Sequence, residues 1–118
     1  MEKTKLNNGI EIPMLRIGTF MQTLDQAEDS VYNALKAGYR LIDIANAYQN
    51  EKGVGRGIKK SGVPREEIFL ETKLWPAFYE EEDQVERTLK RLDTEITCKL
   101  CSNETSFRWS KIIMLILY

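Results

Sequence analysis

Three ionisable side chains, Asp43, Tyr48 and Lys73, fall where neighbouring strands of a parallel sheet would end. Asp43 closes the short apolar run that begins at Leu41, Tyr48 follows in the next loop, and Lys73 closes a second apolar run that begins at Ile68. The carboxyl ends of parallel strands meet at one edge of a sheet, where α/β folds carry their chemistry. We therefore expect Asp43 and Lys73 to come within ion-pair range, with Tyr48 leaning over them.

A tyrosine, a lysine and a carboxylate in this arrangement can transfer a proton. A tyrosine with an ordinary pKa of about 10 is a weak donor at neutral pH, and a neighbouring ammonium favours the phenolate. A carboxylate beside the lysine keeps that ammonium charged in a partly dry pocket. Spacing alone fits an ordinary ion pair beside a solvent-facing tyrosine at least as well, so the pattern leaves both interpretations open.

Strand and helix signals alternate around these residues. Asn8-Gly9 is a strong turn signal between alternating flanks and predicts a hairpin over residues 5–12. A helix is expected from a capping box at Asp25 and Glu28 to the terminating Gly38. The remaining predicted elements are strands over 14–19, 41–43 and 68–73 and helices over about 50–62 and 81–92. This order indicates an α/β fold with a parallel sheet and right-handed crossovers, made of a hairpin and three βα units.

Two further segments have less distinctive patterns. The glycine-rich run 53–57 follows a loop and lacks the third glycine of a dinucleotide fingerprint, so we expect a closely packed helix start there. After Thr94 the alternation of Ile96, Cys98 and Leu100 fits one more strand, whereas residues 102–106 have a loop composition. Residues 109–118 fit either a short helix or a strand.

Composition narrows the function classes. The chain has 118 residues, of which 42% are hydrophobic and 30% charged, as in one soluble globular domain. Its net charge of −1 gives no basis for binding nucleic acid or an anionic membrane surface, and the apolar block 112–118 is too short to span a bilayer. The chain contains no histidine, and Cys98 and Cys101 lack further zinc ligands, so we expect no metal site. Reduced thiols and the lack of a signal-peptide pattern favour a cytoplasmic protein.

Colinear motifs between about Lys5 and Leu92 resemble the aldo-keto reductase family. They are Leu6-Asn7-Asn8-Gly9 with Ile12-Pro13, Gly18-Thr19-Phe20, Ala37-Gly38-Tyr39-Arg40-Leu41-Ile42-Asp43, Tyr48 with Asn50-Glu51, Val54-Gly55, Val63-Pro64-Arg65-Glu66-Glu67 and Thr72-Lys73-Leu74-Trp75. The resemblance implies a partial (β/α)8 barrel, of which the hairpin and about three βα units are present. It also implies an NADP(H)-dependent oxidoreductase that reduces small aldehydes and ketones to alcohols by hydride transfer.

By the same resemblance, Tyr48 is the general acid, Lys73 tunes it and Asp43 holds Lys73. Gly18, Thr19 and Phe20, together with Asp43, match positions beside the nicotinamide of the cofactor. Phe20 and Trp75, together with Tyr48, match positions that line the substrate pocket. Core filling at the strand ends is the alternative for the two aromatic residues.

Three departures from the family pattern stand out. Arg16 occupies a position where the family usually has glycine, and a long charged side chain there is costly unless it is paired. Ile44 replaces the usual threonine after the aspartate. Past the third helix the family continues with a strand closing on Leu-His, which carries a fourth catalytic residue, whereas this chain reads Thr94-Glu95-Ile96-Thr97 and has no histidine.

These departures predict an incomplete enzyme. A (β/α)8 barrel takes about 250 residues. We expect residues 1–94 to be the N-terminal portion of a barrel and residues 95–118 a divergent tail, for which out-of-frame translation is one explanation. The truncated chain is then expected to be inactive. The alternative is a non-catalytic fragment or interaction module that self-associates through exposed strand edges and its apolar tail.

Overall fold

The computed structural model describes residues 2–6, 9–74, 84–93, 98–100 and 113–117. Strands and helices alternate in the order that the sequence predicts. The elements are β1 (Lys3–Lys5), β2 (Glu11–Pro13), β3 (Arg16–Gly18), α1 (Leu24–Lys36), β4 (Leu41–Asp43), α2 (Glu51–Ser61), β5 (Phe69–Leu74), α3 (Gln84–Leu92), β6 (Cys98–Leu100) and β7 (Ile113–Leu117), with 3-10 turns η1 (Asn46–Tyr48) and η2 (Arg65–Glu67). The predicted start of the third helix at residue 81 lies outside the described residues.

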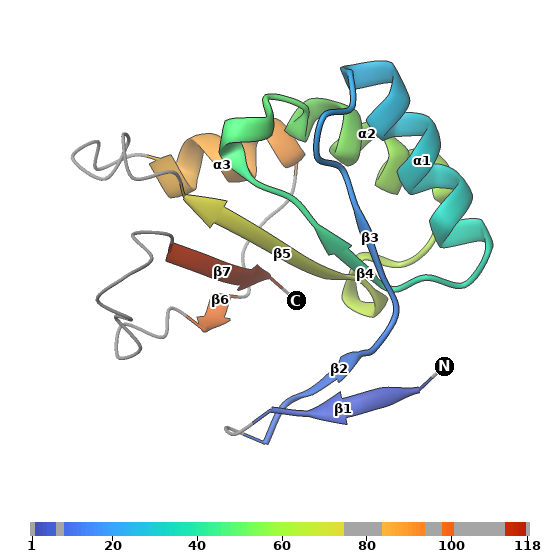
Figure 1. The fold of residues 1–118 in the computed structure, drawn as a ribbon, viewed down its shortest axis with the longest axis vertical. Coiled ribbons are helices and arrows are strands. Elements are labelled where there is room, and N and C mark those ends of the chain that lie inside the picture. The colour runs from blue at the N-terminus through green and yellow to red at the C-terminus, as the bar shows by residue number, and fades with distance from the viewer. Residues whose placement is uncertain (1, 7–8, 75–83, 94–97, 101–112, 118) are drawn as a thin grey trace.

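The main sheet has the strand order β3-β4-β5-β7-β6. β3, β4 and β5 are mutually parallel, and their register places Gly18, Asp43 and Glu71 side by side. The three helices gather on one side of these strands, and the antiparallel β1–β2 hairpin lies beyond the end where β3 begins (Figure 1). The strands therefore run away from the hairpin, and their carboxyl ends form the opposite edge.

Helix α1 begins two residues earlier than the sequence predicts. Thr23, not Asp25, is the N-cap: its hydroxyl accepts from the Gln26 backbone N–H at 3.2 Å, while the Gln26 side chain accepts from the Thr23 N–H at 3.0 Å. A hydroxyl three residues before a glutamine completes the reciprocal capping box. Asp25 instead lies within the first turn, where its charge is favoured by the helix dipole. The end of α1 agrees with the prediction, since Gly38 follows it at φ 100°.

The core lies between the helices and one face of the parallel strands. Its buried side chains are Ala27, Val31, Leu35, Ile42, Ile44, Val54, Ile68, Leu70 and Leu92. The glycine-rich run lies in α2 and packs closely, as predicted: a Cβ added at Gly55 would lie 2.5 Å from the Leu92 carbonyl oxygen, and one at Gly57 would lie 2.6 Å from that of Glu28. Glycines therefore let α2 approach α1 and α3 more closely than any other residue would allow.

The C-terminal apolar block contributes a strand, which resolves the helix-or-strand question left by its sequence. β7 pairs antiparallel with β5, from Leu74 opposite Ile113 to Leu70 opposite Leu117, and β6 pairs antiparallel with β7. The edge of β5 is therefore occupied by a strand of the same chain. None of the helices in the described part of the chain has both the length and the apolar character required to cross a membrane.

Candidate active site

Asp43 and Lys73 form an ion pair across two adjacent parallel strands. The register places Asp43 opposite Glu71, so Lys73 lies two residues further toward the carboxyl end of β5 and faces the same side. Its Nζ donates to Asp43 Oδ1 and lies 3.4 Å from the Ile44 carbonyl oxygen. The two side chains are 23% and 17% exposed, which leaves the ammonium partly desolvated but reachable from one side.

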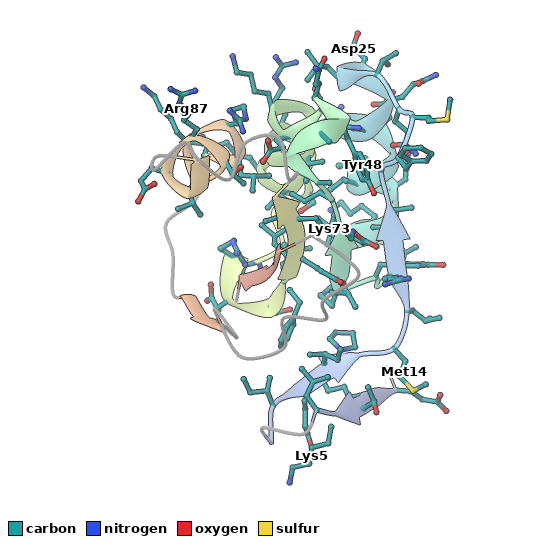
Figure 2. All side chains as sticks on the ribbon, turned by 60° about the vertical axis from the view of Figure 1, so that its left-hand side comes forward. Lys5, Met14, Asp25, Tyr48, Lys73 and Arg87 are labelled. Carbon is teal, nitrogen blue, oxygen red and sulfur yellow. The ribbon has the colours of Figure 1, made fainter. Side chains whose placement is uncertain are left out.

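Tyr48 lies over this pair, on the turn η1 that follows β4. Lys73 Nζ is 5.9 Å from the centroid of the Tyr48 ring. The Phe20 ring, from the loop after β3, meets the Tyr48 ring edge-on, with 5.2 Å between centroids and an interplanar angle of 60°. Figure 2 shows Tyr48 and Lys73 at the same end of the sheet, away from Met14 and the hairpin. The structure thus brings together four of the predicted site residues, while their catalytic roles stay predictions.

The Gly18-Thr19 segment forms the neighbouring edge of the site. Gly18 is the register partner of Asp43, and a Cβ added there would meet no atom within 4 Å, so the space above this strand end is open. The Thr19 backbone N–H donates to the Asp43 carbonyl at 3.3 Å, whereas its side chain is fully buried. Phe20 is 67% exposed. Trp75, the remaining predicted site residue, lies outside the described residues.

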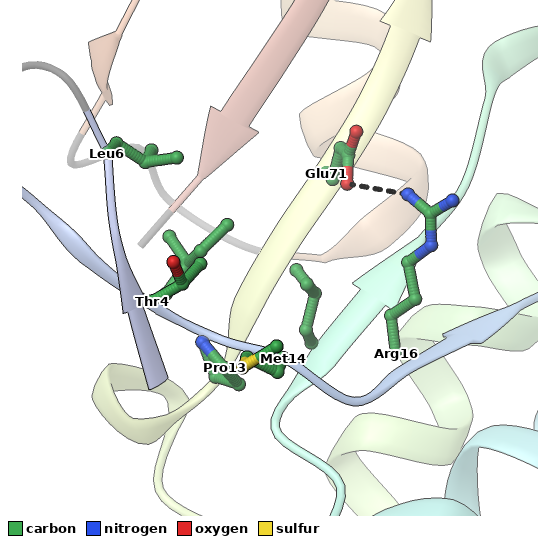
Figure 3. A pocket seen from close by; sticks show the side chains of 8 residues that line it. Thr4, Leu6, Pro13, Met14, Arg16 and Glu71 are labelled. Carbon is green, nitrogen blue, oxygen red and sulfur yellow. Dashed lines mark ion pairs between the residues drawn. The ribbon is translucent and has the colours of Figure 1, made fainter. Parts of the chain in front are cut away.

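Arg16 has acidic partners in the structure and its side chain is 59% exposed, so the cost expected of a buried, unpaired charge does not arise. Its Nη1 lies 3.5 Å from Asp43 Oδ2 and 3.8 Å from Glu71 Oε2, and Figure 3 shows the contact with Glu71. Burial raises the pKa of Glu71 above its ordinary value, and the Asp43 carboxylate adds to the rise, against the opposing effects of Lys73 and Arg16. Glu71 is not among the site residues expected from the sequence. Two-residue alternation along β5 places it on the same face as Lys73 and was the signal that could have found it.

A separate cavity of about 340 Å³ lies between the hairpin and the sheet. It is lined by Thr4, Leu6, Ile12, Pro13, Met14, Arg16, Leu41 and Glu71. None of the predicted site residues within the described part of the chain lines it, and Figure 3 shows the hairpin side chains facing the Arg16–Glu71 pair across it. We therefore place the candidate chemistry at the Tyr48 end of the strands, where the polar groups converge, and not in this mostly apolar cavity.

The geometry suits proton transfer. A phenol stands beside a partly buried ammonium that is fixed by a carboxylate, and an exposed aromatic ring covers one side of the phenol. A cation close to a phenol stabilises the negative charge that develops on the oxygen as the proton leaves. The simple ion pair considered from spacing alone is present, but the tyrosine lies against the pair and does not stand apart in solvent.

The sequence matches the aldo/keto reductase family model over residues 15–98. Among curated proteins, it is 53% identical over 89 residues to an aldehyde reductase of Saccharomyces cerevisiae, a match that covers 75% of this chain and 28% of the relative. It is 49% identical over 75 residues to a glyoxal reductase of Bacillus subtilis, covering 63% of this chain and 27% of the relative. The chain thus spans little more than a quarter of the length of these relatives.

Solved structures give the same assignment. An aldo/keto reductase from Brucella melitensis superposes with a TM-score of 0.77 at 44% identity, over 80% of this chain and 37% of that one. A Bombyx mori aldo-keto reductase in complex with NADP superposes with a TM-score of 0.72 at 38% identity, over 80% and 35% of the two chains. The parallel strands β3, β4 and β5 and the helices that cover them are therefore a partial (β/α)8 barrel, to which the antiparallel β6 and β7 do not belong. The chain belongs to the aldo/keto reductase family.

Proposed function

We propose that this site contributes to NADP(H)-dependent reduction of small aldehydes or ketones, with Tyr48 as the proton donor. The observation that carries the proposal is the position of the Lys73 ammonium, which is bound to the Asp43 carboxylate and lies 5.9 Å from the Tyr48 ring centroid. Similarity to an aldehyde reductase and a glyoxal reductase supports the carbonyl substrate class.

The residues at the strand ends fit the nicotinamide part of the cofactor. Open space above Gly18 beside the Asp43 carboxylate, next to the exposed Phe20 ring, leaves room for a flat ring. Gly18, Phe20 and Asp43 would border it there, whereas Thr19 is fully buried and supports the strand end through its internal hydrogen bonds. Similarity to a glycerol 2-dehydrogenase (NADP(+)) of Saccharomyces cerevisiae and to the NADP complex supports this choice of cofactor. The bound cofactor supplies the hydride.

Proton donation involves three side chains with different roles. Tyr48 donates its phenolic proton to the carbonyl oxygen of the substrate as negative charge builds on that oxygen. The Lys73 ammonium beside the ring is assigned the role of stabilising the negative charge left on the phenolic oxygen, because a nearby opposite charge favours an anion. Asp43 holds Lys73 in place through its Oδ1 atom and offsets the cost of keeping a partly buried ammonium charged. Phe20 restricts the Tyr48 ring from one side.

The 118-residue polypeptide by itself is proposed to lack turnover. It contains no histidine and matches only about 28% of the length of its Saccharomyces relative. We likewise propose that residues 1–94 form the barrel portion and residues 95–118 a divergent segment, which the end of the family match at residue 98 supports. Reading the coding DNA after codon 92 tests this division, since another frame that continues toward a Leu-His strand would establish the frame-shift.

The function is tested by complementation. The 118-residue chain is mixed with the remaining part of the Saccharomyces aldehyde reductase, and NADPH oxidation with a simple aldehyde is measured for each component and for the mixture. We expect turnover in the mixture alone, lowered by Tyr48→Phe about 100-fold or more, the usual contribution of a positioned general acid. Tyr32→Phe is the matched control, because Lys60 lies 5.1 Å from the centroid of that ring in α1, outside the candidate site.

Each other outcome has a definite meaning. Turnover by the 118-residue chain alone that Tyr48→Phe abolishes would overturn the proposed inactivity and keep the proton-donor role. Turnover in the mixture that Tyr48→Phe leaves unchanged would overturn the role of Tyr48. A mixture that forms a complex, binds NADP and does not oxidise NADPH would favour the non-catalytic alternative.

A further inference from the structure

Asn50 stands at the start of α2 but does not act as a helix cap. Asparagine at this position normally accepts a hydrogen bond from a backbone N–H of the first helical turn. Here the Asn50 side chain makes no capping bond, although it is the N-cap residue and is only 1% exposed. A buried amide that leaves its usual partners must have others, because an unpaired polar group in the interior is costly.

Its partners lie on the loop after β3. Asn50 Nδ2 donates to the Thr19 carbonyl at 2.7 Å and to the Gln22 carbonyl at 3.1 Å, and the Thr19 hydroxyl donates to Asn50 Oδ1 at 3.4 Å. Thr19 and Gln22 are the first and last residues of a turn that the Gln22 N–H closes onto the Thr19 carbonyl at 3.3 Å. One buried side chain therefore holds both ends of this turn.

The turn needs such a restraint. Met21, its third residue, has φ 58°, a left-handed conformation that non-glycine residues adopt at a cost in energy. Met21 is also 85% exposed, so its own side chain has little packing to fix that conformation. Gln49, directly before Asn50, is in the same region at φ 57°. Strained residues of this kind persist only where the surrounding structure determines them.

Each strained residue directly follows a ring of the candidate site. Phe20 precedes Met21, and Tyr48 precedes Gln49, so the backbone conformation at these two residues helps set where the two rings point. Asn50 joins the two loops by hydrogen bonds across 28 and 31 residues of sequence. We propose that Asn50 is a positioning residue that fixes the Thr19–Gln22 turn to the Tyr48 loop and so holds Phe20 against Tyr48. Its importance for carbonyl reduction rests on the proposed function, whereas the ring contact itself does not.

The test is NMR on the full 118-residue chain without cofactor or substrate, so its outcome is independent of whether the site reduces carbonyls. Aspartate is as favourable as asparagine at a helix start, so Asn50→Asp keeps that preference and an oxygen acceptor but loses the two amide donors. We expect it to lose the cross-peak between the Phe20 and Tyr48 rings while the methyl signals of the core residues Val31 and Ile42 stay in place. Asn33→Asp is the matched control, because Asn33 lies exposed on α1.

A second substitution distinguishes positioning from a merely structural role. Glycine adopts the left-handed conformation without steric cost, so Met21→Gly should keep the turn shape without the restraint. We expect Met21→Gly to restore the ring cross-peak in the Asn50→Asp background. Retention of the cross-peak in Asn50→Asp, or no recovery with Met21→Gly, would overturn the proposal.

The unmodified chain provides a measurement that does not depend on a variant folding. Both side-chain amide protons of Asn50 should be protected from hydrogen exchange relative to those of Asn33, because Nδ2 of the buried Asn50 donates to the Thr19 and Gln22 carbonyls. Should Asn50→Asp fail to fold, this comparison decides: protection supports the restraint, and exchange as fast as that of Asn33 overturns it.

Discussion

The parallel strands β3, β4 and β5 have one apolar face and one charged face. Successive side chains of the same strands alternate between the two faces. On the helix side, Ile42, Ile44 and Leu70 are fully buried. On the other side, the four charges of Arg16, Asp43, Glu71 and Lys73 contact one another. Because side chains alternate with a period of two, a shift of one residue in register would place Asp43 among the helices. One pattern thus specifies both the core and the site.

The largest expected effect comes from breaking the apolar face. Ile42→Ala removes a side chain with 0% exposure and leaves a cavity between β4 and the helices. We expect a loss of about 2–5 kcal/mol in the free energy of unfolding, measured by chemical denaturation. Leu15→Ala, at a position 56% exposed, is the matched control and should change the same quantity by less than about 0.5 kcal/mol. Equal losses at the two positions would contradict the assignment of the core.

On the charged face, Glu71 is expected to make a smaller contribution, which appears as a pH dependence of the free energy of unfolding. The pKa of Glu71 is raised above its ordinary value of 4.5, so the folded state holds this proton more tightly than the unfolded chain. The associated stability is complete below pH 4.5 and is lost as the pH rises through the raised folded-state pKa. Glu71→Gln should remove this part of the pH dependence, measured as the free energy of unfolding against pH.

Arg16→Met provides a second test in the same measurement of the free energy of unfolding against pH. Arg16 opposes the rise in the pKa of Glu71, so its removal should raise that pKa further and extend the pH window upward. Methionine keeps an unbranched apolar stem on the strand and removes the guanidinium group with its charge. Parallel pH profiles for the unmodified chain and Glu71→Gln would show that Glu71 does not titrate differently in the two states.

The smallest effect is expected for an ion pair on the outer surface. Lys59 Nζ lies 2.6 Å from Asp93 Oδ2, but both side chains are more than 70% exposed. Water and salt screen such a pair, so Lys59→Gln should leave the denaturation midpoint within experimental error. Repeating the measurement at low and high salt checks this. A loss of stability as large as that of Ile42→Ala would contradict the contrast between the exposed surface and the buried face of the sheet.

Much of the fold could be predicted because local signals and tertiary structure agree. Gly38 and Gly62 end α1 and α2 in left-handed conformations, and Leu41–Asp43 is a strand with the predicted bounds. The proximity of Asp43 to Lys73 followed from parallel pairing alone, because adjacent strand ends share one edge. Family resemblance then favoured a catalytic interpretation over a plain ion pair, which spacing could not do, and the catalytic roles of these residues stay predictions.

Other features depend on information that local sequence does not carry. Thr23 with Gln26 and Asp25 with Glu28 both fit the spacing of a capping box. Only the structure shows that α1 begins at the first of the two. The contact between Arg16 and Glu71 could be predicted only with the register of the three parallel strands, which the sequence does not give. Asn50 resembled an ordinary helix start in the sequence, since its partners lie about thirty residues away. A continuous apolar run such as 113–117 fits a strand or a buried helix equally.

The antiparallel pairing of β7 with β5 also bears on how the sheet assembles. α1, β4 and α2 connect neighbours close in sequence, so their contacts can form early, whereas β7 joins β5 across roughly forty residues of chain. Contacts of such long range are acquired late in folding, after the entropy of closing the intervening loop has been lost. Until then β5 presents an unpaired edge to other chains. An unpaired strand edge is a template for association with other chains, so we expect dilute conditions to favour the intramolecular pairing of β5 with β7 during refolding.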